Sequence, residues 1–415
     1  MAERGLTDTG ATASASGATL AGALARPAVR VAIVYLAARV LTSGFLMLAS
    51  MLSPEGSRFG RGASLATYVL AWDAQWYWLI AVEGYPTDLP RDDNGDVVQN
   101  AWAFMPVFPV LARLVGAPFG SWAVGAFLIA LVAGYLCCLV LYRMFAERLG
   151  GTAATWSVVF VAAGPLALLF QVGYAESLFL LLILLGIRLL ERRRYLPLYP
   201  LVLAMAYVRP GVLAFALLVG LVGLWRWFSR SRDPLSAGEI AHILGVGALA
   251  TAAGLSWPLI AGAVTGDPTG YLETELSWRR LWLGDAGAFV PFEGWIQAAQ
   301  FWFGATWRVG EIWGYVALAA IVVGSAALLL FEPHVRRLGV VPRLWAASYL
   351  LYLFAVFFPQ SSVFRLLFPL APLFGALAVP RSTAWRLAVL GACLLGQWWW
   401  IWNMYGIGSN FWQIP

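Results

Sequence analysis

Long hydrophobic runs separated by short polar segments dominate the chain. The core of a lipid bilayer is crossed by about 17–25 apolar residues in a helix. By this rule the pattern predicts eleven membrane spans, near residues 30–52, 122–143, 152–171, 174–190, 196–208, 210–228, 241–263, 311–331, 344–359, 364–379 and 386–402. The span at 196–208 is short and begins with two prolines, so the total can be ten or twelve. We therefore predict an all-α polytopic membrane protein built as a bundle of about eleven transmembrane helices.

The arginines predict how this bundle is oriented. They cluster in every second loop, as the excess of basic residues in cytoplasmic loops requires. Residues 1–28 then form a disordered cytoplasmic N-terminus, residues 29–403 the transmembrane domain, and residues 404–415 an external tail. The two long loops, 53–121 and 264–310, fall outside the plasma membrane. Of the 21 Asp and Glu residues, 14 lie on this external side, so we expect the chemistry there.

Composition agrees with this class and removes several others. Of 415 residues, 61% are hydrophobic and 12% are charged, against roughly 25% charged in soluble domains. A soluble enzyme and a disordered scaffold are excluded. The chain has no Lys, which excludes Schiff-base chemistry, and its two His, His242 and His334, are too few for a His-built metal site. The arginines are scattered in short loops, so we expect no nucleic-acid partner. We also expect no cofactor and no metal site.

The first external loop contains the most informative segment, Trp72 to Tyr85, which places the carboxylate of Asp73 among Trp and Tyr rings. Trp72, Trp76 and Ile80 follow a helical spacing, which predicts a short interfacial helix. Asp73 is then either the N-cap of this helix or a general base, and the two roles are compatible. A second run, from Ala103 to Pro109, is too short to span and predicts another interfacial segment.

The sequences WDAQWYWLIAVEGY and AFMPVFPVLARL resemble the first loop of PIG-V-type mannosyltransferases, the GPI mannosyltransferase II family of the GT-C glycosyltransferases. Four shorter stretches also fit bacterial relatives: YAESLF at 174–179, YVRPG at 207–211, GDP at 266–268 and FR at 364–365. The resemblance therefore covers residues 72–372. The insert at 87–100 is longer and more acidic than the family pattern. The resemblance implies a GT-C-like bundle with interfacial helices in the first external loop. It also implies transfer of mannose from a polyprenyl-phosphate-mannose donor to a cell-envelope glycolipid or glycan acceptor on the external face.

The resemblance also assigns roles to residues. Asp73 is the expected general base, acting with inversion at the sugar. Arg209 and Arg365 are the expected ligands of the phosphate, although an arginine at a helix end can also extend to the lipid headgroups. Glu176 binds the acceptor or orients Asp73. The full set of candidates for substrate binding is Trp72, Gln75, Trp76, Tyr77, Glu83, Tyr85, Tyr174, Glu176, Arg209, Trp278, Arg279 and Arg365.

Three questions stay open in the sequence. Arg39 lies inside the first span, where a charge is costly, and is expected to pair with a buried acid or carbonyl. Asp92 to Asp96 is expected to form a solvated turn, and a weakly bound divalent cation there remains an alternative. A multi-pass lipid or small-solute transporter or flippase is the alternative function, although the long acidic external loops favour an enzyme.

Overall fold

The computed structural model describes residues 26–408. Residues 1–25 of the predicted N-terminal segment (1–28) and residues 409–415 of the predicted tail (404–415) lie outside the described residues, whereas Pro27 and Ala28 already belong to the first helix. The regular elements of the described chain are all helices, and its one β-bridge joins Arg91 to Val97. The predicted all-α fold is confirmed.

Helix occurs in each of the eleven predicted spans. Four helices are long and apolar enough to cross a membrane: α2 (Pro27–Leu52), α6 (Trp122–Leu149), α11 (Ala237–Thr265) and α14 (Glu311–Phe331). The other unbroken spans are α8 (Glu176–Glu191), α9 (Leu198–Ala206), α10 (Val212–Phe228), α16 (Val340–Val356) and α19 (Thr383–Ile401). Together with the composition, these helices make the protein a helical membrane protein.

Two predicted spans are broken. The span at 152–171 consists of α7 (Gly151–Ala162) and a 3₁₀ turn, Ala167–Phe170. The span at 364–379 consists of α17 (Val363–Leu366), a 3₁₀ segment (Phe368–Leu373) and α18 (Phe374–Leu377). A broken helix inside a membrane protein leaves carbonyl groups that need partners from elsewhere in the protein.

Arg39 of α2 supplies these partners at the first break. Its guanidinium donates to the carbonyls of Ala162 and Ala167 and, over 3.0 Å, to the side chain of Gln171. It also lies over the rings of Tyr35 and Phe170. The expected pairing of Arg39 with carbonyl groups is confirmed.

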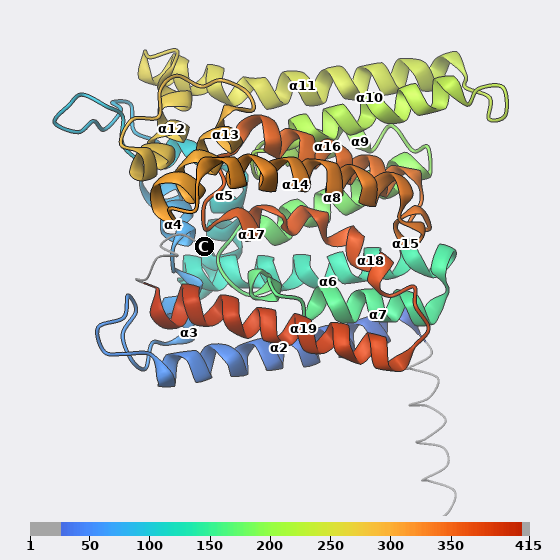
Figure 1. Ribbon diagram of the computed structural model, residues 1–415, viewed down its shortest axis with the longest axis horizontal. Coiled ribbons are helices and arrows are strands. Elements are labelled where there is room, and N and C mark those ends of the chain that lie inside the picture. Colours follow the sequence, from blue (N-terminus) through green and yellow to red (C-terminus); the bar gives the residue numbers. More distant parts are fainter. Residues whose placement is uncertain (1–25, 409–415) are drawn as a thin grey trace, which may run out of the picture.

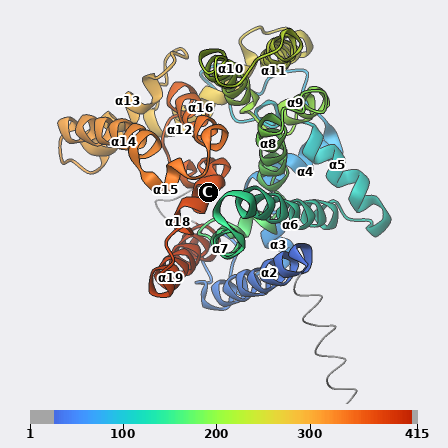
Figure 2. The same ribbon diagram turned by 90° about the vertical axis from the view of Figure 1, so that its right-hand side faces the viewer.

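The spans run along the long axis of the molecule, and the view along that axis shows them end-on around a central region (Figures 1 and 2). The helices of the two predicted external loops gather at one end. These are α3 (Leu65–Val69), α4 (Asp73–Glu83), α12 (Gly270–Leu283) and α13 (Glu293–Ala299). The turn between α10 and α11 lies at the opposite end, together with α15 (Pro333–Arg336).

The acidic insert joins these two loops. Asn100 donates to the Thr274 hydroxyl over 2.8 Å, Arg280 donates to the carbonyl of Val97, and Arg91 forms an ion pair with Asp267 at 3.0 Å. At the tip of the insert, the Asp92 carboxylate accepts from the backbone N–H groups of Asn94 and Asp96, which makes the expected turn. The insert therefore fixes α12 above the first loop.

Candidate active site

Asp73 is the first residue of α4, and the backbone changes direction directly before it. Trp72 has φ 55° and ψ −124°, a left-handed conformation that is strained for a residue with a bulky side chain. Trp72 is held there by a 2.9 Å hydrogen bond from its indole N–H to the carbonyl of Met404 and by the Arg58 guanidinium, 4.2 Å above its ring. Because Trp72 occupies the N-cap position and no side chain caps α4, the capping role for Asp73 is wrong.

The Asp73 carboxylate instead begins a chain of four charged side chains. Arg365 donates to Asp73, and its Nε lies 3.4 Å from Glu176, which forms an ion pair with Arg209 at 2.5 Å. The side chains of Asp73, Arg365, Glu176 and Arg209 are 14%, 8%, 1% and 10% exposed. Two acids and two arginines cancel one another, as buried charges must. Four sequence candidates, 292 residues apart at the extremes, thus form one network.

Aromatic side chains enclose this network. The guanidinium of Arg365 lies 5.2 Å from the ring centre of Tyr174. Tyr77 is buried edge-on against Phe104 and Phe108, and burial followed by the charge of Glu176 raises the pKa of its hydroxyl. Tyr77 is therefore neutral and available as a hydrogen-bond donor. Within the described chain, Oε2 of Glu176 has no hydrogen-bond partner, so this buried network keeps an unused acceptor.

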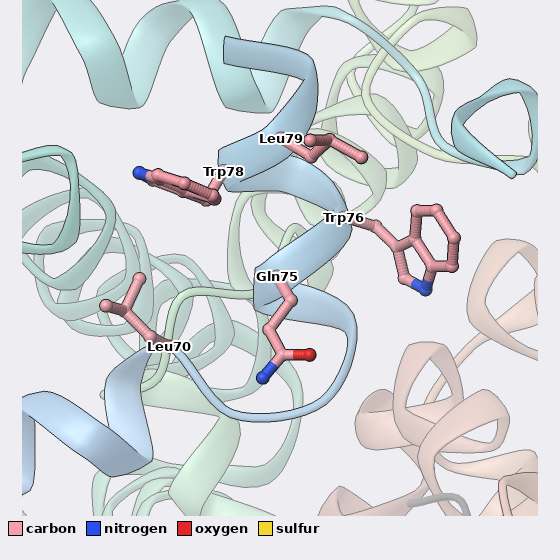
Figure 3. Close-up of a pocket in the computed structure, with 5 residues that line it drawn as sticks. All are labelled: Leu70, Gln75, Trp76, Trp78 and Leu79. Carbon is pink, nitrogen blue, oxygen red and sulfur yellow. The ribbon is translucent and has the colours of Figure 1, made fainter. Parts of the chain in front are cut away.

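A wall of three rings connects the two loops. Trp76 of α4 stacks on Phe104 with 5.9 Å between ring centres, and Trp278 of α12 meets both rings edge-on at 6.3 and 6.0 Å. Trp76 also lines a surface hollow with Leu70, Gln75, Trp78 and Leu79; Trp76 and Trp78 point to opposite sides of α4 (Figure 3). Apolar rings beside carboxylates suit a ligand that has both hydroxyl groups and C–H faces.

Glu275 of α12 belongs to this site and is missing from the sequence candidates. Its side chain is exposed, yet the surrounding protein raises the pKa of its carboxyl to about 7, while the Tyr271 hydroxyl and the Arg209 charge lower it and the Asp73 charge raises it. Glu275 thus combines an exposed side chain with surroundings that disfavour its charge. The available signal was its spacing, one helical turn before Trp278, but nothing in the sequence showed which side of α12 faces α4.

Three other candidates lie away from the network. Glu83 is exposed at the last position of α4, ten residues and about 15 Å along the helix from Asp73. Tyr85 donates to the carbonyl of Phe104 over 2.8 Å and packs on Trp102. Arg279 donates to Gln297 of α13 over 3.2 Å, and burial lowers the pKa of its guanidinium. Their roles in substrate binding stay predictions.

Metal-binding geometry is not found in the described chain: between residues 26 and 408, no group of three or more His, Cys, Asp or Glu side chains could hold an ion. The network of Asp73 and Glu176 is instead occupied by two arginines.

Comparison of the sequence with protein-family models and with curated proteins finds no match. Two solved structures of an Archaeoglobus fulgidus oligosaccharyltransferase are similar in fold. One was crystallised with zinc and sulfate (TM-score 0.41, 14% identity, 88% of this chain and 52% of that chain covered). The other was tethered to an acceptor peptide (TM-score 0.37, 14% identity, 92% and 56% covered). This chain therefore spans about half the length of the structures it matches. The resemblance to the PIG-V-type enzymes stays a prediction.

Proposed function

We propose that this protein is an integral-membrane glycosyltransferase with Asp73 as its general base. It transfers a sugar, mannose by the sequence resemblance, from a polyprenyl-phosphate donor to a cell-envelope glycolipid or glycan on the external face. The observation that carries the proposal is the position of Asp73. It is a carboxylate fixed by Arg365 at the start of a helix, beside an aromatic wall where both acidic loops meet.

The reaction needs little more than this geometry. Asp73 takes the proton of an acceptor hydroxyl, whose oxygen attacks the anomeric carbon of the donor sugar. The bond from that carbon to the phosphate oxygen breaks, its electron pair leaves with the polyprenyl phosphate, and the anomeric configuration inverts. General-base assistance of this kind contributes about 10²–10⁴-fold. Phosphate is already a good leaving group, so the step needs positive charge but no acid.

The source of that charge is constrained by the network. Glu176 and Asp73 already neutralise Arg209 and Arg365. These arginines can therefore bind a phosphate only while they also remain paired with the two carboxylates. Arg58 is different. It is exposed, it lies on the ring of Trp72 next to Asp73, and no acidic side chain between residues 26 and 408 forms an ion pair with it. We propose Arg58 as a further cation for the phosphate, with Arg209 and Arg365 behind it.

The test is sugar transfer in membranes that contain this chain. The membranes receive radiolabelled polyprenyl-phosphate-mannose and native lipid extract, and wild type is compared with Asp73→Asn. We expect transfer by the wild type and a loss of at least 100-fold in the variant, because an amide cannot accept the proton. Asp88→Asn, an exposed carboxylate of the same loop, is the control and should transfer normally. Membrane insertion of all three proteins is checked by immunoblotting.

Each other outcome contradicts a defined part of the proposal. Normal transfer by Asp73→Asn would remove Asp73 as the base. Absence of transfer by correctly inserted wild type, across polyprenyl-phosphate-mannose and polyprenyl-phosphate-glucose donors, would remove the enzyme class. The transporter or flippase alternative would then be measured directly, as flux of a fluorescent lipid in proteoliposomes.

A further inference from the structure

Glu275 occupies one face of α12 with two aromatic residues. Tyr271, Glu275 and Trp278 follow one another at i, i+4 and i+7, which places them on the same side of a helix. That side faces α4, because the ring of Trp278 contacts the ring of Trp76. Beside this face, the insert holds α12 through two bonds: Asn100 donates to the Thr274 hydroxyl, and Gln99 donates to the backbone carbonyl of Ser277. The orientation of α12 is thus set by contacts with the insert and with α4.

The two helices present the same pair of groups to each other. On α4 a carboxylate, Asp73, comes one turn before Trp76; on α12 a carboxylate, Glu275, comes one turn before Trp278. The two indoles meet at 6.3 Å, so each carboxylate lies about one turn from a shared aromatic wall. Both loops carry these helices to the same end of the molecule (Figure 1).

Glu275 differs from the other acids of the site because it is not neutralised. Asp73 and Glu176 pair with arginines, and Glu273, two residues before Glu275, pairs with Arg280 at 3.1 Å. In the described chain Glu275 forms no ion pair, its side chain is exposed, and the Tyr271 hydroxyl donates to it. Tyr271 uses one of about four lone-pair sites of the carboxylate, so Glu275 keeps acceptor capacity for a ligand. A carboxylate has two oxygens and can accept from two neighbouring hydroxyl groups at once.

We infer that Glu275 is a sugar-binding residue. Its carboxylate accepts hydrogen bonds from adjacent hydroxyl groups of a sugar ring, whose C–H face packs on Trp278 and Trp76. This places the sugar within reach of Asp73. The inference deepens the proposed function and rests on it for the identity of the site as a transferase site. A sugar ring is common to donor and acceptor, and the experiments below separate the two.

The first experiment measures binding without turnover. The full chain in lipid nanodiscs, free of sugar-based detergent, is titrated with methyl α-D-mannopyranoside, and binding is followed by saturation-transfer NMR. Wild type is expected to bind, and Glu275→Gln to bind at least 10-fold more weakly, because an amide can no longer accept at both positions. Glu273→Gln, on the same helix but paired with Arg280, should bind as wild type does. Equal binding by Glu275→Gln, or no binding by wild type, would overturn the inference.

The second experiment assigns the sugar. In the transfer assay, Glu275→Gln should raise KM for one substrate at least 10-fold while kcat changes less than threefold, and Glu275→Asp should recover part of the loss. A raised donor KM identifies the donor sugar as the ligand, and a raised acceptor KM identifies the acceptor. Unchanged KM for both, with wild type active, refutes the role of Glu275 and leaves the transferase intact. An inactive wild type that still binds the probe through Glu275 refutes the transferase alone.

Discussion

At the scale of single residues, Asp73 is a carboxylate whose position is fixed by its partner Arg365. Arg365 holds the carboxylate from one side, and the strained backbone of Trp72 sets where α4 begins. Asp73 itself could be found in the sequence, because a lone acid among Trp and Tyr residues is conspicuous. Its pairing with Arg365 could not, because that contact joins the first external loop to a break in a late span.

The buried pair of Glu176 and Arg209 is predicted to be strongly coupled. Glu176→Gln leaves buried positive charge uncompensated and should lower the free energy of unfolding by about 3–5 kcal/mol. Arg209→Gln should cost a similar amount, and the double variant should recover part of it, giving a coupling energy of about 1–3 kcal/mol. The measurement is unfolding in mixed micelles by SDS titration.

The control for this cycle is the pair of Glu147 and Arg188, which is 2.8 Å apart but 51% and 22% exposed. Solvent screens such a pair, so the same cycle should give less than about 1 kcal/mol. Equal coupling at both pairs would contradict the importance of burial at the site.

Glu275 predicts a pH dependence of sugar binding. Burial raises the pKa of its carboxyl from 4.5 to about 7, with Asp73, Arg209 and Tyr271 as the ionisable groups that act on it. The charged form, which accepts at both oxygens, forms as pH rises through 7, so the wild type should bind the sugar more tightly at pH 8 than at pH 6. In the folded state the raised pKa favours the protonated form, so the contribution of Glu275 to stability is largest at low pH and decreases from about pH 4.5 to 7. Binding by Glu275→Gln should be independent of pH over this range; a slope as steep as that of the wild type would exclude Glu275 as its source.

At the scale of helices, the sequence predicted where the membrane spans lie better than whether each span is one continuous helix. The span at 152–171 contains Gly164 and Pro165, and a proline cannot supply the N–H that a continuous helix needs. The helix ends at Ala162. Hydropathy averages over such a break, because a broken span is as apolar as an intact one. The sequence showed that Arg39 is a charge inside an apolar span. Its partners could not be predicted, because the carbonyls of Ala162 and Ala167 are free to accept only where the helix is broken.

Arg39→Met is therefore predicted to destabilise the protein although it removes a charge from an apolar span. Two carbonyls and the Gln171 side chain would lose their donor, at a cost of about 2–4 kcal/mol. Thermal unfolding of the purified protein should show a clearly lower Tm. Arg337→Met, at an exposed position beyond α15, should leave Tm nearly unchanged. A Tm of Arg39→Met at or above the wild-type value would show that the break needs no donor.

The whole molecule separates its acidic loops from its basic turns, one set at each end (Figure 1). Arginine spacing predicted which loops share an end of the molecule without any knowledge of helix packing; the side of the membrane that each end faces stays a prediction. Contacts between the two loops, such as that between Asn100 and Thr274, could not be predicted from the sequence, because they depend on how the spans pack around one another.

The predicted orientation can be measured with single cysteines. Asn94→Cys, at the exposed tip of the insert, should react with a membrane-impermeant maleimide in intact cells. Arg337→Cys, at the opposite end, should react only after the cells are permeabilised. The native residues Cys137, Cys138 and Cys393 are buried, so the wild type provides the unlabelled background. The reverse labelling pattern would place the site on the cytoplasmic side.

The contact between Trp72 and Met404 has a consequence for biosynthesis. The segment Trp402–Ile407 holds the start of α4 through the Trp72 indole, and Ile407 accepts from the backbone N–H of Arg58. Asp73 leaves the ribosome early, but the groups that fix its helix are made more than 300 residues later, since Trp72 and Met404 are 332 positions apart. A chain still in the translocon has every residue of the first loop and lacks the support that positions Asp73. The support of this site is thus completed only near the end of synthesis, and under the proposed function an unfinished chain would be inactive toward its donor.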